Sequence, residues 1–207
     1  MNKSTVMTEG PIWRKILFFS IPLILGNLFQ QLYNTVDSII VGNYIGSEAL
    51  AAVGSIINLL IGFCIGASAG AGVVISQFFG ARDKEGVRKA VHTTIAIAIG
   101  AGIILTAAGI LLAPVILRAM GTPAEVFGQA VTYLQVYFGG ILFSVIYNMS
   151  AGILNAVGNS KRSLLYLMIA AISNIFLDLL FVVALKMGIV GAALATDISQ
   201  LISCIFI

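Results

Sequence analysis

Long apolar runs recur along the whole chain, and short connectors rich in glycine, asparagine or charged residues separate them. Each run is long enough to cross a hydrocarbon core about 30 Å thick, which takes ~20 residues of α-helix. The pattern predicts six helical spans, at residues 13–41, 49–79, 90–117, 124–157, 163–186 and 189–207. We therefore predict an all-α integral membrane protein in which residues 1–207 form one unit of six transmembrane helices.

Composition supports a membrane protein, and the placement of charge predicts its orientation. Only 9% of the residues are charged, compared with about 25% in a soluble domain. Of the 11 lysines and arginines, all but Arg118 and Lys186 lie near the N-terminus or in the second and fourth connectors. Because cytoplasmic connectors retain positive charge, we predict a cytoplasmic N-terminus in a bacterial-type plasma (inner) membrane. Basic residues scattered in this way do not support nucleic-acid binding.

The first span carries a polar stripe that ends in an acid. Asn27, Gln30, Asn34 and Asp37 recur at intervals of three or four residues, which is the spacing of one helix face. Pro22 lacks an amide hydrogen and is predicted to bend the helix before this stripe begins. We interpret the stripe as one wall of a water-accessible cavity.

Three of the eight acidic residues lie inside predicted spans: Asp37, Asp178 and Asp197. Intramembrane acids cost roughly 2.5–3.5 kcal/mol each on insertion scales, so they usually face a cavity and serve a function. At 1.5 Å per residue, all three are expected about 9–12 Å below the outer ends of their helices. Asn174 lies one turn before Asp178, and Thr196 precedes Asp197. The alternative is that each acid is only a satisfied hydrogen bond between helices.

The oxygen ligands at this depth suit a hard cation or a proton better than a soft metal. The predicted cation site consists of Asp37, Asn174, Asp178 and Thr196. If a metal ion binds, Asp37 and Asp178 are expected to bind sodium only. The coupling ion can be a proton or sodium, because adjacent buried carboxylates can share either a proton or a cation. No other cofactor is expected.

The fourth span is predicted to face the polar stripe across the cavity. It carries Tyr133, Tyr137, Tyr147, Asn148 and Asn155. Aromatic rings beside buried carboxylates favour small organic cations as substrates. The alternative is that these tyrosines serve only packing or the membrane interface.

The second span contains Gly62, Gly66 and Gly70, four residues apart on one helix face. Small residues at this spacing let helices approach closely in a membrane. The pattern predicts a close helix contact along that face.

Several segments resemble one family of transporters. "IPLILGNLFQQLYNTVDSIIVGNYIGSEALAAVG" is similar to its first span and following loop, "QFFGARD" to its second-to-third loop, "GILNAVGNSKR" to its fourth-to-fifth connection, and "NIFLDLLFV" with "GIVGAALAT" to its last two spans of one lobe. The family is the multidrug and toxic compound extrusion (MATE) transporters. The resemblance implies a six-helix lobe facing a second lobe around a central cavity, and export of drugs or metabolites driven by sodium or protons. Because family members have twelve spans, this chain looks like the N-terminal lobe, with the C-terminal lobe as its expected partner.

The resemblance also implies roles for individual residues. In this family a cation site combines acids of the first and fifth spans with an asparagine and a threonine, and Pro22 matches a proline at which the first span bends. Gln30 and Tyr33 match substrate-facing positions, while Asp197 is not part of the family's pattern. The positions that match the cation site are Asp37, Asn174, Asp178 and Thr196.

Three other functions compete with this interpretation. A flippase of lipid-linked precursors would favour a wide basic cavity, whereas the residues expected to face the cavity are acidic or neutral. An ion channel would need a continuous pore, which a single cluster of acids does not indicate. An enzyme is not expected, because the lone His92 lies beside basic residues at the predicted interface and has no catalytic partner within the spans. No phosphate-binding loop indicates ATP as the energy source.

Overall fold

The computed structural model describes residues 12–207, with side chains for all of these except residues 12, 15, 33 and 44–49. The described chain is helical and contains no strand. In order, it forms α1 (Ile12–Gly80), α2 (Lys84–Ala119), α3 (Ala124–Ala156), α4 (Ser160–Asp178), the π-helix η1 (Leu179–Ala184) and α5 (Gly188–Phe206).

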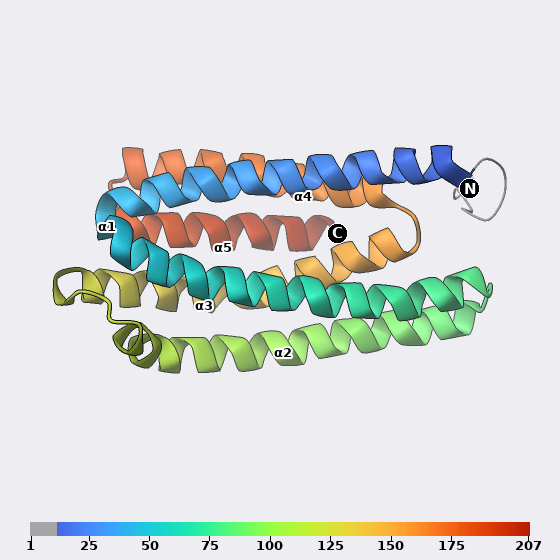
Figure 1. Cartoon of the computed structure of the whole chain (residues 1–207), viewed down its shortest axis with the longest axis horizontal. Helices are drawn as coiled ribbons and strands as arrows, with labels where there is room; N and C mark the ends of the chain where they lie inside the picture. Colours follow the sequence, from blue (N-terminus) through green and yellow to red (C-terminus); the bar gives the residue numbers. More distant parts are fainter. Residues whose placement is uncertain (1–11) are drawn as a thin grey trace.

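Six stretches are long and apolar enough to cross a membrane, which confirms the predicted all-α membrane fold. They run lengthwise through the bundle (Figure 1). Two of them belong to α1, which turns back on itself at one end of the bundle, so helical backbone continues where the sequence predicted a connector. The stretches are Ile16–Asn43, Leu50–Gly80, Lys84–Ala119, Ala124–Ala156, Ser160–Ala184 and Gly188–Phe206.

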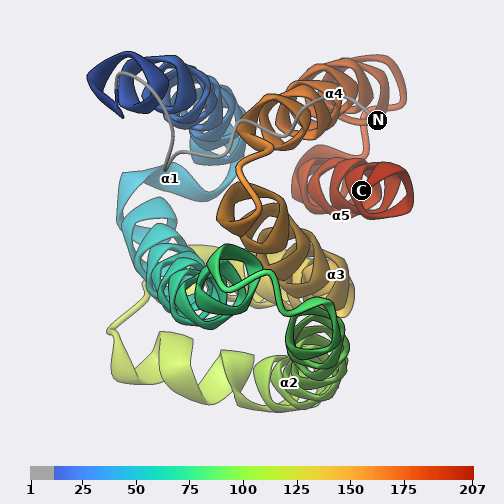
Figure 2. The same ribbon diagram turned by 90° about the vertical axis from the view of Figure 1, so that its right-hand side faces the viewer.

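The centre of the bundle is α3, which packs against α1, α2 and α5 (Figure 2). About half of the spans formed by α3 and α5 is buried, compared with 12% of the first span. Glycines make the close approach between α2 and α3 possible, because a side chain at Gly109 would collide with Phe138 and one at Gly102 with Leu142. The remaining helices therefore expose apolar side chains, as lipid or a further protein surface requires.

The predicted contact along Gly62, Gly66 and Gly70 is wrong within the described structure. A side chain built at any of these three positions would meet nothing within 4 Å. Their spacing permits close packing but does not choose which helix face turns inward. The second span instead approaches α3 through Ser68, which packs on Gly152.

The connectors divide between the two ends of the bundle as the sequence predicted. The start of α1, the turn before α2 and the connector between α3 and α4 lie at one end, and the other connectors lie at the opposite end (Figure 1). Arg82 and Lys84 are thus at the first end, while Arg118 and Lys186 are at the second. Which end is cytoplasmic stays a prediction.

Two features of the spans differ most from the prediction. The third span begins at Lys84 rather than at residue 90, because the Asp83 carboxylate accepts a hydrogen bond from the Gly86 amide (2.9 Å) and caps a charged first turn. The fifth span stops being α-helical at Asp178 and continues as the π-helix η1. Hydropathy cannot reveal either feature, since both depend on backbone hydrogen bonds.

Candidate functional site

A pair of buried carboxylates lies where α1 meets α4. Asp37 of α1 and Asp178 of α4 are close enough for their charges to act on each other. Asp178 and Asn174 have no exposed surface. Among the described residues, no group donates a hydrogen bond to Oδ1 of Asp37, to either carboxylate oxygen of Asp178, or to Oδ1 of Asn174. These buried acceptors call for a proton, a cation or water.

Neutral oxygens complete the wall of this site. The Asn174 amide donates from Nδ2 to Oγ1 of Thr196 over 3.5 Å. Thr196 in turn donates to the carbonyl of Ala192 over 3.2 Å. These two bonds orient the Asn174 amide so that its oxygen remains available beside Asp178, one helical turn away. The structure therefore brings together the four residues that the sequence assigned to a cation site.

Tyr133 of α3 is a further member of the site. Its hydroxyl donates to Oδ2 of Asp37 over 3.3 Å, and its ring stacks on that of Tyr137 with a centroid distance of 6.4 Å. The sequence placed Tyr133 across from the stripe but gave no sign of this bond, because 96 residues separate the partners. A neutral donor can hold Asp37 in place without supplying a competing positive charge.

Asp197 has a different environment from the acid pair. Its side chain packs on Gly140 of α3, where any added side chain would collide with the carboxylate. Tyr137 of α3 lies near enough to both Asp197 and Asp37 to interact with their charges. Asp197 thus faces α3, whereas its neighbour Thr196 faces Asn174 of α4.

The described residues provide no strong site for a transition metal. No group of three or more His, Cys, Asp and Glu residues among them could hold a metal ion. Nor does any lysine or arginine in the described structure form a salt bridge with Asp37 or Asp178. Two carboxylates with neutral oxygens are compatible with a proton or a monovalent hard cation.

A large cavity occupies the other half of the lobe. Its volume is about 1310 Å³, and it lies between both spans of α1, the end of α3 and the start of α4. Its polar lining includes amide and hydroxyl side chains, among them Asn155, whose Oδ1 is buried without a donor in the described structure. Neither Asp37 nor Asp178 lines it. Lining residues from the predicted set are Pro22, Asn27, Gln30, Tyr147, Asn148 and Asn155.

Three residues predicted for this cavity are not part of its described wall. Asn34 lies one turn beyond Gln30, toward Asp37, where the cavity has ended. Tyr137 is buried among Tyr133 and Phe138 in the core. The side chain of Tyr33 lies outside the described residues. Pro22 sits inside α1, which stays helical through it, and a bend there stays a prediction.

The mouth of the cavity is basic, contrary to the prediction that its residues would be acidic or neutral. Arg82, Lys84 and Arg88 line it together with a single acid, Asp83. The Asp83 carboxylate already caps α2, and no salt bridge joins these cations to an acid in the described structure. The sequence placed these residues in a connector, and only the fold shows that this connector borders the cavity.

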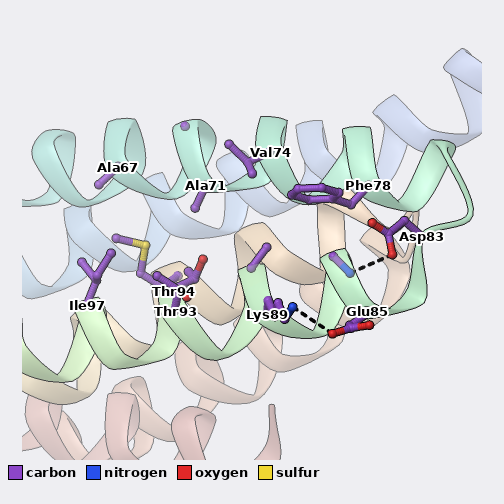
Figure 3. A pocket seen from close by; sticks show the side chains of 14 residues that line it. Ala67, Ala71, Val74, Phe78, Asp83, Glu85, Lys89, Thr93, Thr94 and Ile97 are labelled. Carbon is purple, nitrogen blue, oxygen red and sulfur yellow. Dashed lines mark hydrogen bonds and ion pairs between the residues drawn. The ribbon is translucent and has the colours of Figure 1, made fainter.

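A second hollow, of about 830 Å³, lies between the second span of α1 and the start of α2 (Figure 3). Ala71, Val74 and Phe78 of α1 face Thr94 and Ile97 of α2 across it. Its charged groups already have partners. Lys89 forms a 2.8 Å ion pair with Glu85, and the Asp83 carboxylate caps α2. An apolar groove with satisfied charges offers no chemistry of its own.

A six-helix lobe with intramembrane acids and a polar cavity defines a membrane transport protein. The MatE family model matches residues 22–180, and the chain belongs to this family. This confirms the resemblance that the sequence motifs indicated. The match covers the polar stripe, the cavity and both carboxylates of the pair.

Named relatives agree with this assignment. The probable multidrug resistance protein YpnP of Bacillus subtilis is 35% identical over 207 residues, covering 99% of this chain and 46% of YpnP. A crystal structure of MATE in the bent conformation superimposes on the whole chain with a TM-score of 0.88 and 31% identity, using 46% of its own length. A transporter from Pyrococcus furiosus, described as having a binding pocket of reversed polarity that suggests a different function, gives a TM-score of 0.86 with 32% identity over 46% of its length. The chain spans about half the length of the proteins it matches.

Proposed function

We propose that this chain is one lobe of a cation-coupled antiporter that exports organic cations, drugs or metabolites across the inner membrane. The observation that carries the proposal is the pair of Asp37 and Asp178, in which Oδ1 of Asp37 and both oxygens of Asp178 are buried and accept no hydrogen bond from the described residues. A second six-helix lobe would complete the transporter, because the relatives are about twice as long.

The coupling ion would bind between the two carboxylates. Two ionised acids in a medium of low dielectric repel each other, so the pair is stable only when a proton or a cation is shared. Sodium would use both carboxylates together with the Asn174 and Thr196 oxygens. A proton would instead neutralise one acid. We propose that the two ions compete for one site.

Ion exchange would act on the transport cycle through α1. Asp37 and Pro22 belong to the same span, and the cavity residues Asn27 and Gln30 lie between them. Loss of the shared ion would weaken the attraction between α1 and α4 and release the first span to bend at Pro22. Cavity shape and ion occupancy would thereby be linked without direct contact between ion and substrate.

Substitution of each carboxylate tests the coupling role. In the gene product that carries this chain, Asp37→Asn and Asp178→Asn should abolish gradient-driven efflux of a cationic dye at normal membrane insertion. Glu125→Gln, an exposed acid in the first turn of α3, is the control. Wild-type efflux in either aspartate variant contradicts the proposal. Everted vesicles show which ion drives transport. Dye efflux that follows a sodium gradient but does not respond to a pH gradient would exclude the proton as the coupling ion.

We further propose that the end of the bundle bearing Arg82 and Lys84 is cytoplasmic, because it holds most of the positive charge. An impermeant thiol reagent should leave Asp83→Cys unlabelled in intact cells and label Met120→Cys, which is exposed in the same connector as Thr122, in a background without Cys64 and Cys204. The opposite pattern would reverse the orientation.

A second candidate function has one observation in its favour. The basic mouth formed by Arg82, Lys84 and Arg88 would attract an anionic substrate, as a flippase of lipid-linked precursors requires. Replacing these three residues distinguishes the two functions, because it would weaken transport of an anionic lipid but not of a cationic dye.

A further inference from the structure

A column of buried polar side chains runs along α5. It begins at Thr196, beside the acid pair, and continues toward the last turns of the helix. Ser199, Gln200 and Ser203 follow Thr196 at intervals of three or four residues, so the four share one helix face. Ser199 and Ser203 have no exposed surface, and Gln200 is 7% exposed. The site proposed above uses none of these three residues. Polar groups are costly to bury within a membrane protein, which calls for a reason.

Hydrogen bonds tie this column to α4 at two levels. At the upper level Thr196 accepts from Asn174, and at the lower level Ser203 donates to the Tyr166 carbonyl over 3.0 Å. The two contacts are about two turns apart on both helices, a distance of roughly 10 Å. Ser199, between them, donates to the carbonyl of Thr196 over 2.8 Å. Buried polar side chains therefore follow one another along α5 from Thr196 to Ser203.

The bonding along the column is incomplete. Among the described residues, no group donates to the buried Oε1 of Gln200, to Oδ1 of Asn174 or to either oxygen of Asp178. The hydroxyls of Ser199 and Ser203 donate their hydrogens to backbone carbonyls, so they can act only as acceptors toward other groups. Acceptors alone cannot satisfy one another, and buried water is the donor that proteins commonly use in such places.

The acid pair also needs a route for its ion that is separate from the large cavity, since neither Asp37 nor Asp178 lines that cavity. We propose that water threads the α5 column and carries protons between Asp178 and the level of Ser203, in the direction of the end of the bundle that we assign to the cytoplasm. In each step a carboxyl or hydronium O–H bond breaks as a new O–H bond forms on the next water, and Asp178 is left as a carboxylate. The proposal rests on the proposed function in taking Asp178 as a proton-exchanging group.

Thiol accessibility tests the water column without any transport measurement. In the gene product that carries this chain, with Cys64→Ala and Cys204→Ala, single cysteines replace Ser199, Ser203 or, as control, Ala98. Ala98 is equally buried but packs where α2 meets α3. Silver ion added to the cytoplasmic face should consume the thiols at 199 and 203 and spare the one at 98, since the reaction requires a water-accessible thiolate. If silver ion reacts equally slowly with the thiols at all three positions, the proposed water column is wrong.

Matched substitutions test the proton route. Ser203→Val and Ser203→Thr have nearly the same shape and differ in the hydroxyl, which Val lacks and Thr keeps. Gln200→Met removes the amide. Loss of one side chain that hydrogen-bonds to the water column should slow pH-driven dye efflux about tenfold in the Val and Met variants. Equilibrium dye binding should stay unchanged, and the Thr variant should transport normally. Wild-type efflux rates in both the Val and Met variants overturn the route.

The same experiment separates this inference from the proposed function. If the unsubstituted protein ignores a pH gradient, the proposed proton coupling fails, and the proton route fails with it. The silver labelling then decides by itself whether the column holds water.

Discussion

The acid pair and the cavity are both polar regions inside one apolar lobe, yet they differ in nearly every physical respect. Asp178 and Asn174 are fully buried, and a neutral tyrosine hydroxyl holds Asp37. The cavity is large, and its wall includes amides together with Arg82, Lys84 and Arg88. Acidic side chains are thus enclosed in one half of the lobe, and basic side chains line the cavity in the other. The comparison suggests that ion exchange and substrate selection can be altered separately.

The largest expected effect concerns the space available in the core beside Asp197, compared with that at the cavity wall. Gly140→Ala should lower the free energy of unfolding by about 1–3 kcal/mol, because its Cβ would collide with the Asp197 carboxylate. Gly72→Ala, at the cavity wall, should be neutral or stabilising, since its Cβ would lie 3.7 Å from the nearest atom. Thermal unfolding in detergent measures both. Equal losses in the two variants would remove the contrast in packing.

A smaller effect should separate two tyrosines. Tyr133→Phe removes the donor to Asp37 and should raise the sodium concentration for half-maximal effect about tenfold, with dye affinity unchanged. Tyr147→Phe removes a polar group from the cavity wall and should alter dye affinity without changing the sodium response. Transport titrations in proteoliposomes measure both quantities. If either substitution changes both responses equally, the two regions act as one site.

The smallest effect should come from the basic mouth. Replacing Arg82, Lys84 and Arg88 with Gln should speed uptake of a cationic dye a few-fold at low ionic strength and not at high salt, because exposed charges are screened. The control is Lys161→Gln with Arg162→Gln, which removes exposed charge that does not line the cavity. A salt-independent change, or an equal change in the control, contradicts this role for the mouth.

Hydropathy and spacing predicted the spans and the acid pair because both depend on short-range pattern. Asn174 and Asp178 fall one turn apart in any helix, and the cost of a buried acid marks Asp37 from sequence alone. The Tyr133 contact could not be predicted, since it depends on how α3 docks on α1. The column of Thr196, Ser199, Gln200 and Ser203 was visible as a three-to-four spacing in the sixth span. Its significance appears only once α4 covers it.

The π-helix η1 has a consequence for how this gene can change over generations. A π turn holds about one residue more than an α turn, so losing any single residue from Leu179–Ala184 would let the segment relax to an α-helix. A turn of either kind sweeps one full circle, so the chain after it would keep its orientation relative to Asp178. Thr196 would still face Asn174. A one-codon deletion in this segment should therefore be better tolerated than one within Ser160–Asp178, where it would turn everything that follows by about 100°.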